Sequence, residues 1–458
     1  MNSPVALDPQ QLYPFALDEF QLEAIAALNR DESVVVCAPT GSGKTLIGEY
    51  AIYRALANNC RVFYTTPLKA LSNQKFRDFG EEFGRDRVGL LTGDVSINRD
   101  APVVVMTTEI FRNMLYGTPI GEVGTSLEGV QAVVLDECHY MNDKQRGTVW
   151  EESIIYCPPS IQLVALSATI ANSGQLTDWI DKVHGPTQLI YSDYRPVPLE
   201  FSFASKKGLY PLLEPDKTGQ LVCNPRLKTK RPQKLMKRGE RPPAPDRARL
   251  VQQLRNRDML PAIFFIFSRR GCDSAVNEMG MVNLVESDRE RDSLSKQIRQ
   301  FCQENPEAVR RSQLDALYRG IAAHHAGILP AWKMLVESLF QQGLIKVVFA
   351  TETLAAGINM PARTTVISSL SKRTDSGHRL LTASEFLQMS GRAGRRGKDT
   401  IGYVVTVQTP FEGAREAAYL ATSEADPLVS QFTPSYGMVL NLLQKHTIDT
   451  ARELVERS

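Results

Sequence analysis

The sequence lacks the long hydrophobic runs and the leader pattern that would direct a chain to a membrane or out of the cell. No apolar run in its 458 residues approaches the ~20 residues that a membrane-spanning helix needs. The first twenty residues, MNSPVALDPQQLYPFALDEF, have neither the basic start nor the apolar core of a signal peptide. We therefore expect no membrane partner and a cytoplasmic location, with nuclear and organellar locations left open.

Paired cysteines and a strong net charge are also missing. The seven cysteines are scattered and form no Cys-x-x-Cys pair, which argues against a zinc site and against a disulfide framework. The formal net charge is only +2, so the composition carries no overall signal for nucleic acid. A nucleic-acid partner would have to be met by a local surface.

Short apolar runs alternating with amphipathic helical stretches fill most of the chain. The runs include SVVVC, RVFYTT and QAVVL in the first half, and AIFF, KVVFA and GYVVTV in the second. Strands that alternate with helices predict parallel sheets covered on both faces, so the fold class is α/β with two units. We assign residues 1–200 and 257–410 to these units.

The remaining segments differ in composition. Between Lys206 and Arg249, thirteen lysines and arginines face only four acidic residues, and proline is frequent. We interpret 201–256 as a basic linker or insertion, with 224–246 as its most linker-like part. Residues 411–458 have a pattern typical of helix and loop.

A glycine-containing turn joins the first predicted strand to a helix and has the spacing of a phosphate-binding loop. Its one departure is an alanine where the general pattern has its first glycine. Glycines let backbone N–H groups turn onto phosphate oxygens, the lysine reaches the β- and γ-phosphates, and the threonine can ligate Mg²⁺. The predicted loop consists of Ala38, Pro39, Thr40, Gly41, Ser42, Gly43, Lys44 and Thr45.

Two adjacent carboxylates, Asp136 and Glu137, follow the buried run VVL. A phosphate-loop protein needs a carboxylate at the end of a neighbouring strand to hold its metal ion. Asp136 has that role in our interpretation. Glu137 would orient or deprotonate the water that attacks the γ-phosphate.

The second unit contains the string QMSGRAGRR. Arg392 and Arg395 are three residues apart, so we expect them to share one face of a helix. An arginine that reached the γ-phosphate across a domain cleft would accelerate hydrolysis by roughly 10³–10⁵. A basic helix that binds solvent or carbonyl groups is the alternative.

Together with Ser167-Ala168-Thr169, these motifs resemble the signature set of second-superfamily helicases. The strings TTPLKALSNQKF, QRGTVWEE, AAHHAGILP and ATETLAAGINMPA, and His139 in the acid motif, are similar to those of superkiller-type DExH RNA helicases. The resemblance implies two tandem RecA-like domains, with FTPSYGMVLNLLQ as the start of a C-terminal winged-helix region. We therefore expect the chain to be a helicase-core fragment.

The resemblance also implies roles for particular residues. ATP and Mg²⁺ would be the cofactors, with Thr45 and Asp136 on the metal. Phe15 and Gln21 would face the adenine, Ser167 and Thr169 would link the nucleotide to the strand-binding side, and Gly357 and Asn359 would sense ATP. The implied catalytic set is Lys44, Asp136, Glu137, Gln388, Arg392 and Arg395.

Residues after strand ends are candidates for phosphate contacts with one nucleic-acid strand. For any single threonine an ordinary helix cap is the favoured alternative, and His324 and His325 could equally be core histidines. The candidates are Pro67, Lys69, Gly93, Thr107, Thr108, Ser268, Arg269, Arg270, His325 and Thr351.

The function that the resemblance implies is an ATP-driven RNA helicase, moving 3′ to 5′ on single-stranded RNA or on a duplex with an overhang. A monomer acting with an RNA-degrading or RNA-processing complex is expected. SLSKRTDSGHRLLT predicts a hairpin, which in related helicases separates the duplex. A DNA helicase of the repair branch, a non-catalytic RNA-binding scaffold and an unrelated phosphate-loop kinase are the alternatives.

Overall fold

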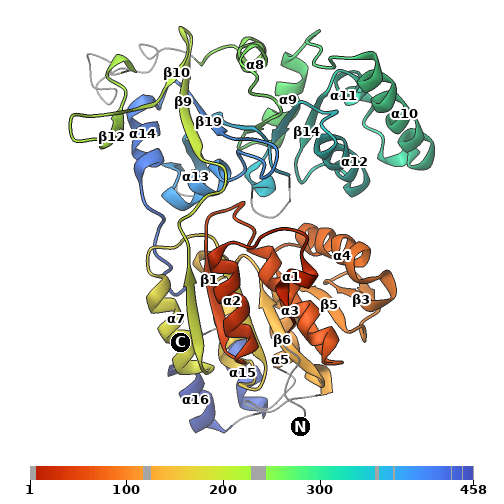
Figure 1. Cartoon of the computed structure of the whole chain (residues 1–458), viewed down its shortest axis with the longest axis vertical. Coiled ribbons are helices and arrows are strands. Elements are labelled where there is room, and N and C mark those ends of the chain that lie inside the picture. Colours follow the sequence, from red (N-terminus) through yellow and green to blue (C-terminus); the bar gives the residue numbers. More distant parts are fainter. Residues whose placement is uncertain are drawn as a thin grey trace. The chain divides into compact units, whose positions relative to one another are not determined.

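The computed structural model describes residues 7–116, 125–227, 244–355, 360–374, 377–434, 436–445 and 447–456. The chain forms two compact units (Figure 1). Unit 1 comprises Met1–Tyr194 together with Asp426–Ser458, and unit 2 comprises Arg195–Ala425. The chain therefore leaves unit 1 once and later returns to it.

Unit 1 is built on an eight-stranded sheet with the order β4-β3-β5-β2-β6-β7-β1-β8. All neighbouring strands are parallel except the edge pair of β3 and β4. Strands rich in β-branched residues form this sheet because both of its faces are covered. The strands are β1 Ser33–Cys37, β2 Arg61–Thr66, β3 Val88–Leu91, β4 Ser96–Ile97, β5 Val103–Thr107, β6 Val130–Leu135, β7 Gln162–Ser167 and β8 Thr187–Tyr191.

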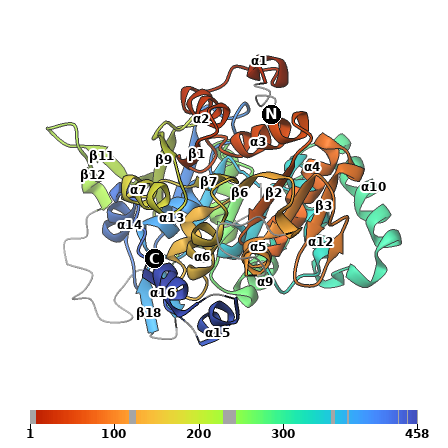
Figure 2. The same cartoon turned by 90° about the horizontal axis from the view of Figure 1, so that it is seen from below.

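Helices cover both faces of this sheet (Figure 2). Val34 and Val36 of β1 pack with α2 and α3, while Val35 and Cys37 face α6, α7 and the C-terminal helices. This alternation follows from the period of two in a strand. The helices are α1 Pro9–Leu12, α2 Glu19–Asn29, α3 Thr45–Ala57, α4 Lys69–Phe83, α5 Thr108–Leu115, α6 Thr148–Tyr156, α7 Ser173–Val183, α15 Tyr436–Lys445 and α16 Ile448–Glu456, with short 3-10 turns η1 Arg85–Arg87, η2 Thr125–Leu127 and η3 Cys138–Asn142.

Unit 2 has a seven-stranded sheet with the order β10-β9-β19-β16-β13-β15-β14, parallel except for the edge pair of β9 and β10. Its strands are β9 Leu199–Ser205, β10 Gly208–Pro211, β13 Ala262–Phe265, β14 Ile321–His324, β15 Val347–Ala350, β16 Thr364–Ile367 and β19 Gly402–Val407. Its helices are α8 Arg247–Asn256, α9 Arg269–Glu278, α10 Asp288–Glu304, α11 Leu314–Tyr318, α12 Pro330–Gln341, α13 Ala383–Ser390 and α14 Ala414–Thr422, with short turns η4 Pro225–Leu227, η6 Pro306–Ala308, η7 Arg311–Gln313 and η8 Glu352–Leu354.

Two antiparallel hairpins complete unit 2: β11 Leu213–Pro215 with β12 Leu221–Cys223, and β17 Ser371–Thr374 with β18 Gly377–Leu380. The second hairpin is the one expected from SLSKRTDSGHRLLT, with Ser371 opposite Leu380. Its expected turn residues Asp375 and Ser376 lie outside the described residues.

The two α/β units with mostly parallel sheets confirm the expected fold class, but their boundaries differ from the expected ones. Residues 201–256 do not form a linker throughout, because β9 pairs with β19 inside the second sheet and α8 packs its buried Leu250 and Leu254 into the core of unit 2. The high content of proline and basic residues concealed these short apolar patterns. Most of the part expected to be most linker-like, 224–246, lies outside the described residues, which omit 228–243.

The expected single C-terminal segment, 411–458, is also divided. The helix α14 packs in unit 2, whereas Asp426–Ser458 belongs to unit 1, where Met438 and Leu442 join the core. The winged-helix start stays a prediction. None of the helices within the described ranges combines the length and the apolar character needed to cross a membrane.

Candidate nucleotide and strand-binding site

The predicted phosphate loop lies between β1 and α3, at the carboxyl end of a buried parallel strand. Gly41 and Gly43 have positive φ values of 85° and 95°, a backbone conformation that favours glycine. The helix α3 begins at Thr45 directly after the loop. Its N-terminus points the N–H groups of its first turn at the place where phosphate binds in such loops.

Lys44 and Gln21 donate hydrogen bonds to backbone carbonyls of the loop. The ammonium group of Lys44 donates to the carbonyls of Ala38, at 2.7 Å, and Pro39, at 3.0 Å. The buried Gln21 amide donates to the Gly43 carbonyl at 3.1 Å and accepts from the Asp18 N–H at 2.9 Å. Gln21 thus ties α2 to the phosphate loop, and the adenine contact predicted for it stays a prediction.

The other predicted adenine residue, Phe15, has a side chain that is 54% exposed. Its ring lies 5.8 Å from that of Tyr13, whose hydroxyl donates to the Leu46 carbonyl in the first turn of α3. Phe15 therefore lies near the phosphate-loop helix with an accessible face. This position is compatible with stacking on a base.

The acid pair sits at the end of β6. Asp136 is almost fully buried, and it accepts hydrogen bonds from the Tyr64 hydroxyl at 2.8 Å and from the Glu137 N–H at 2.9 Å. Glu137 has a φ of 53°, a left-handed conformation that costs a non-glycine residue about 1 kcal/mol. Strain of this kind is retained where the chain must aim a particular side chain.

Burial, together with the neighbouring charge of Glu137, raises the pKa of Asp136 above its ordinary value. A cation near the carboxylate would relieve this desolvation. The hydroxyl of Thr45 and the carboxylate of Asp136 offer the hard oxygen ligands that Mg²⁺ prefers, so the donor set fits the ion. Among the described residues no cluster of three or more His, Cys, Asp or Glu competes for such a metal.

Lys75 of α4 approaches the same place. Its ammonium group lies 3.4 Å from the Thr45 hydroxyl and over the ring of Tyr64, at 5.4 Å from the centroid. Its charge acts on Asp136 and offsets part of the rise in the pKa of that carboxyl. The sequence string TTPLKALSNQKF contains this lysine, but its spacing alone gave no sign of this contact.

His139 joins the acid motif to the Ser167-Ala168-Thr169 motif. Its Nδ1 lies 3.4 Å from the Ala168 N–H and 3.4 Å from the Glu137 carboxylate. A neutral Nδ1 accepts from Ala168, whereas a protonated one pairs with Glu137. His139 therefore lies between the two motifs, and the linking role that the resemblance implied for Ser167 and Thr169 stays a prediction.

The arginine motif of unit 2 corrects one expectation. Arg392 and Arg395 do not share a helical face, because α13 ends at Ser390 and Gly394 has a φ of 83°. The backbone there instead pairs with a neighbouring loop, with Ala362 opposite Ala393. Gln388 lies in the last turn of α13.

Both arginines are held by specific acceptors. Arg392 donates through Nε to the Ala355 carbonyl at 2.9 Å. Arg395 donates to both carboxylate oxygens of Asp399, at 2.7 and 2.8 Å, and Arg363 binds the same carboxylate at 2.9 Å. Asp399 is 1% exposed, and its arginine partners lower its pKa to about 2 despite that burial.

Sequence reasoning missed Asp399 and Arg195. The spacing Arg395–Asp399 is i,i+4 and could have suggested the first pair. Arg195 donates to the carbonyls of Gly391 and Ala393, and burial lowers its pKa to about 10. Nothing local in the sequence pointed to Arg195, because its acceptors are about 200 residues away.

The predicted strand contacts of unit 1 follow two neighbouring strands, since Thr66 of β2 pairs with Thr107 of β5. Pro67 and Lys69 follow β2, and Lys69 forms an exposed ion pair with Asp94, next to Gly93. The Thr108 side chain is fully buried and its hydroxyl donates to the Thr66 carbonyl, so that hydroxyl serves the fold.

In unit 2 the predicted contacts follow three adjacent strands, β13, β15 and β14. Arg269 and Arg270 are exposed in the first turn of α9, while Ser268 caps that helix by accepting from the Gly271 N–H. Thr351 follows β15 and its hydroxyl lies 2.9 Å from that of Thr353. These residues gather at one end of the sheet.

The two histidines at the end of β14 are core residues, in line with the alternative that was left open. His324 and His325 are each 3% exposed and pair with Glu337 and Asp273, respectively. The burial of His325 therefore argues against its direct contact with a nucleic-acid strand. Gly357 and Asn359, the predicted ATP sensors, lie outside the described residues.

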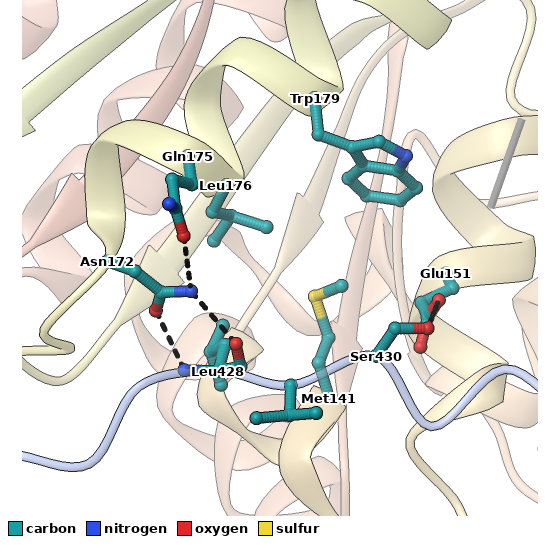
Figure 3. Close-up of a pocket in the computed structure, with 9 residues that line it drawn as sticks. Met141, Glu151, Asn172, Gln175, Leu176, Trp179, Leu428 and Ser430 are labelled. Atoms are coloured by element: carbon teal, nitrogen blue, oxygen red, sulfur yellow. Dashed lines mark hydrogen bonds between the residues drawn. The ribbon is translucent and has the colours of Figure 1, made fainter.

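A strap of the C-terminal segment, residues 426–432, lies against unit 1, close to Met141 and Leu176 (Figure 3). Asn172 exchanges two hydrogen bonds with the backbone of Leu428, and Glu151 accepts from the Ser430 hydroxyl and the Gln431 N–H. Asn142, at the end of η3, contacts the same strap. Between the strap, Met141, Leu176 and Trp179 lies a cavity of about 170 Å³.

The fold and the site together define a phosphate-loop protein with tandem RecA-like units. The family model described as DEAD/DEAH box helicase matches residues 18–176, and the model described as Helicase conserved C-terminal domain matches residues 281–397. The chain belongs to the DEAD/DEAH-box helicases, and Asp136-Glu137-Cys138-His139 assigns it to their DExH group.

Three relatives illustrate the match. The chloroplastic DExH-box ATP-dependent RNA helicase DExH15 of Arabidopsis thaliana is 50% identical, over 94% of this chain and 40% of its own length. The probable helicase HelY of Mycobacterium tuberculosis is 43% identical, over 97% of this chain and 51% of its own length. The ATP-dependent RNA helicase mtr4 of Schizosaccharomyces pombe is 39% identical, over 97% of this chain and 41% of its own length. The chain thus spans about half the length of these relatives or less.

Proposed function

We propose that this chain is the motor core of an ATP-dependent RNA helicase. The observation that carries the proposal is the placement of the phosphate loop after β1 and the acid pair after β6 in one sheet, in a chain of the DExH group. Two of the relatives above are named as RNA helicases, which supports RNA as the polymer.

In the proposed reaction, water attacks the γ-phosphate of ATP. The Glu137 carboxylate accepts the proton of that water, the bond from the γ-phosphorus to the bridging oxygen breaks, and ADP leaves with the electron pair. Lys44 would exchange its two carbonyl acceptors for phosphate oxygens. Mg²⁺, held by Thr45 and Asp136, would supply charge neutralisation at the β- and γ-phosphates.

Gln388, Arg392 and Arg395 are proposed to complete the reaction from unit 2. The buried Asp399 carboxylate supports this role, because it fixes the Arg395 guanidinium in one orientation before any substrate arrives. Preorganised charge of this kind stabilises a transition state without reorganisation at the moment of reaction. Gly357 and Asn359 keep their proposed sensing role.

For nucleic acid, we propose a single strand that follows the loops after β2 and β5 in unit 1 and the exposed start of α9 in unit 2. Contacts would be to phosphates and therefore independent of sequence. Movement from 3′ to 5′, action as a monomer and work beside an RNA-degrading complex belong to the same proposal. A cytoplasmic location is proposed, and the chloroplastic name of one relative makes an organelle the alternative.

The test is ATP hydrolysis by the wild-type chain without polymer, with single-stranded RNA, and with DNA of the same sequence. Stimulation by RNA well above that by DNA is expected. Equal or greater stimulation by DNA would assign the chain to a DNA helicase function. Hydrolysis that no polymer changes, with no binding of either polymer, would contradict a helicase motor altogether.

A further inference from the structure

Arg146 joins the two loops that carry the proposed strand contacts of unit 1. Its guanidinium donates to the Pro67 carbonyl, just after β2, at 2.5 Å. Its Nε donates to the Glu109 carboxylate, in the first turn of α5, at 2.8 Å. The terminal nitrogen that donates to Pro67 also pairs with that carboxylate. One side chain therefore sets the spacing between the loop after β2 and the start of α5.

A tight turn holds the backbone of Arg146. The Asp143 carboxylate accepts the N–H groups of Gln145 and Arg146, each at 2.9 Å, and the Gly147 N–H donates to the Asp143 carbonyl at 2.7 Å. A side chain at position 147 would lie 2.1 Å from the Met141 carbonyl oxygen, so only glycine allows this approach. The turn is thus packed directly against η3.

The short helix η3 begins one residue after Glu137 and ends at Asn142. The path from the acid pair to the strand-binding loops is therefore short and made of direct contacts: acid pair, η3, the turn at Asp143, and the Arg146 guanidinium. A shift of η3 must move Arg146, and with it the Pro67 and Glu109 ends of the two loops. A contiguous chain of contacts of this kind can carry coupling between sites.

The alternative is that Arg146 and Glu109 form an ordinary surface ion pair. Their side chains are 34% and 30% exposed, and pairs of such exposure contribute only ~0–1 kcal/mol to stability. The additional bond to a backbone carbonyl, which carries no charge, gives the arginine a geometric role that an ion pair alone does not need. A small effect on stability with a large effect on strand binding separates the two explanations.

We propose that Arg146 is a positioning residue that couples the acid pair of the ATP site to the strand-binding face of unit 1. The inference rests on the proposed helicase function and adds a residue to it. In this account Arg146 touches neither ATP nor the polymer. It acts by holding the loops after β2 and β5 at the separation that a strand requires.

The variant Arg146→Gln tests this proposal. We expect its affinity for single-stranded RNA, measured by fluorescence anisotropy with a non-hydrolysable ATP analogue, to fall about tenfold, within the usual range of coupling between sites. Hydrolysis of ATP without polymer should stay within about twofold of wild type. Arg146→Lys keeps a charge but fewer donors, and an intermediate affinity is expected.

Glu109→Gln supplies a double-mutant cycle, because it weakens the same contact from the other side. The double variant should lose little more RNA affinity than Arg146→Gln alone. Arg30→Gln is the matched control, since Arg30 pairs with Glu32 and Gln188 just before the start of β1. Its RNA affinity should equal that of the wild type.

Amide hydrogen exchange in the free protein gives a readout that needs no substrate. Residues 68–72 and 108–112 should exchange faster in Arg146→Gln than in the wild type and in Arg30→Gln. Unchanged exchange and unchanged RNA affinity would overturn the proposal, as would a parallel loss of RNA binding, basal hydrolysis and melting temperature. If the wild type binds no polymer, the helicase function fails, and faster exchange at both segments still supports the positioning role.

Discussion

At the scale of single residues, the site combines a strained acid with oriented cations. Glu137 adopts a left-handed backbone and Asp136 is buried beside it, so two carboxylates are held at one strand end against their own repulsion. Tyr64 and Lys75 offset that cost in the free protein. The arrangement is suited to receiving a metal ion and a triphosphate.

Asp399→Asn should lower ATP hydrolysis at least tenfold while nucleotide affinity changes little. The reason is that Asp399 binds both ends of the Arg395 fork, and an amide cannot accept both hydrogen bonds. The measurement is steady-state hydrolysis beside binding of a fluorescent ATP analogue. Asp258→Asn is the control, because this 92% exposed residue pairs with Arg363; equal losses in the two variants would contradict an orienting role.

The same residue predicts a pH dependence of stability. The folded pKa of Asp399 is lowered to about 2, so its contribution to stability is present above its unfolded pKa of about 4 and is lost as the pH falls toward 2. The loss amounts to ~2 kcal/mol. Melting temperatures between pH 5 and 2.5 should fall less steeply for Asp399→Asn than for the wild type; parallel curves would refute this assignment.

At the scale of elements, the hairpin β17–β18 is fastened to its own unit rather than free. Lys372 pairs with Glu352 at 3.0 Å and with Glu385 at 2.5 Å, and Arg379 forms a two-pronged contact with Glu385. These partners lower the pKa of Glu385 to about 2. The hairpin is thus held at its base, beside the start of α13.

Deletion of residues 372–379 should abolish duplex unwinding and leave most of the ATP hydrolysis. The deletion removes a proposed strand separator but touches neither the phosphate loop nor the acid pair. Unwinding of an RNA duplex with a 3′ overhang is measured beside hydrolysis. The double variant Lys372→Gln, Arg379→Gln keeps the hairpin but loosens its base, and should unwind at an intermediate rate; equal loss of both activities in the deletion would count against the separator role.

Elements with strong local signals were predictable from the sequence. Continuous apolar runs and the turn between β1 and α3 identified the sheets and the phosphate loop, because the residues that form them are adjacent in the chain. The strands β9 and β10 were missed because proline and basic neighbours outweighed a weak alternation. The helix expected through Arg392 and Arg395 was wrong because α13 already ends at Ser390, and the backbone after it pairs with a neighbouring loop, Ala393 opposite Ala362.

Contacts between distant segments could not be predicted from the sequence. Arg146 donates to the Pro67 carbonyl, 79 residues away, and Arg195 donates to the Gly391 carbonyl, 196 residues away. No local sequence pattern indicates such a pair. Tyr64 was placed in a strand, but its bond to Asp136 depends on the pairing of β2 with β6. The chemical groups of the site were therefore foreseeable, and the residues that orient them were not.

At the scale of the whole molecule, the chain leaves unit 1 after Tyr194 and returns to it at Asp426. The returning strap accepts and donates hydrogen bonds with Asn142, Glu151 and Asn172. Asn142 and Glu151 follow the acid pair in the chain, and Asn172 follows the Ser167-Ala168-Thr169 motif. Unit 1 is thus completed by residues that lie more than 230 positions beyond its first segment. Its stability must depend on the strap.

Glu151→Ala should lower the free energy of unfolding of unit 1 by ~2 kcal/mol, because it leaves the Ser430 hydroxyl and the Gln431 N–H without their acceptor. Limited proteolysis should then cut within 426–434 faster than in the wild type. Glu32→Ala, far from the strap, serves as the control. Cleavage at the wild-type rate would show that the strap does not depend on this carboxylate.

In the proposed mechanism, Glu137 activates water at a site that binds ATP independently of that step. The most direct measurement compares wild type and Glu137→Gln for ATP hydrolysis with saturating RNA and for binding of a fluorescent ATP analogue. We expect equal nucleotide affinity and a loss of hydrolysis of about 10²–10⁴-fold, the usual contribution of a general base. Hydrolysis by Glu137→Gln at the wild-type rate would contradict it.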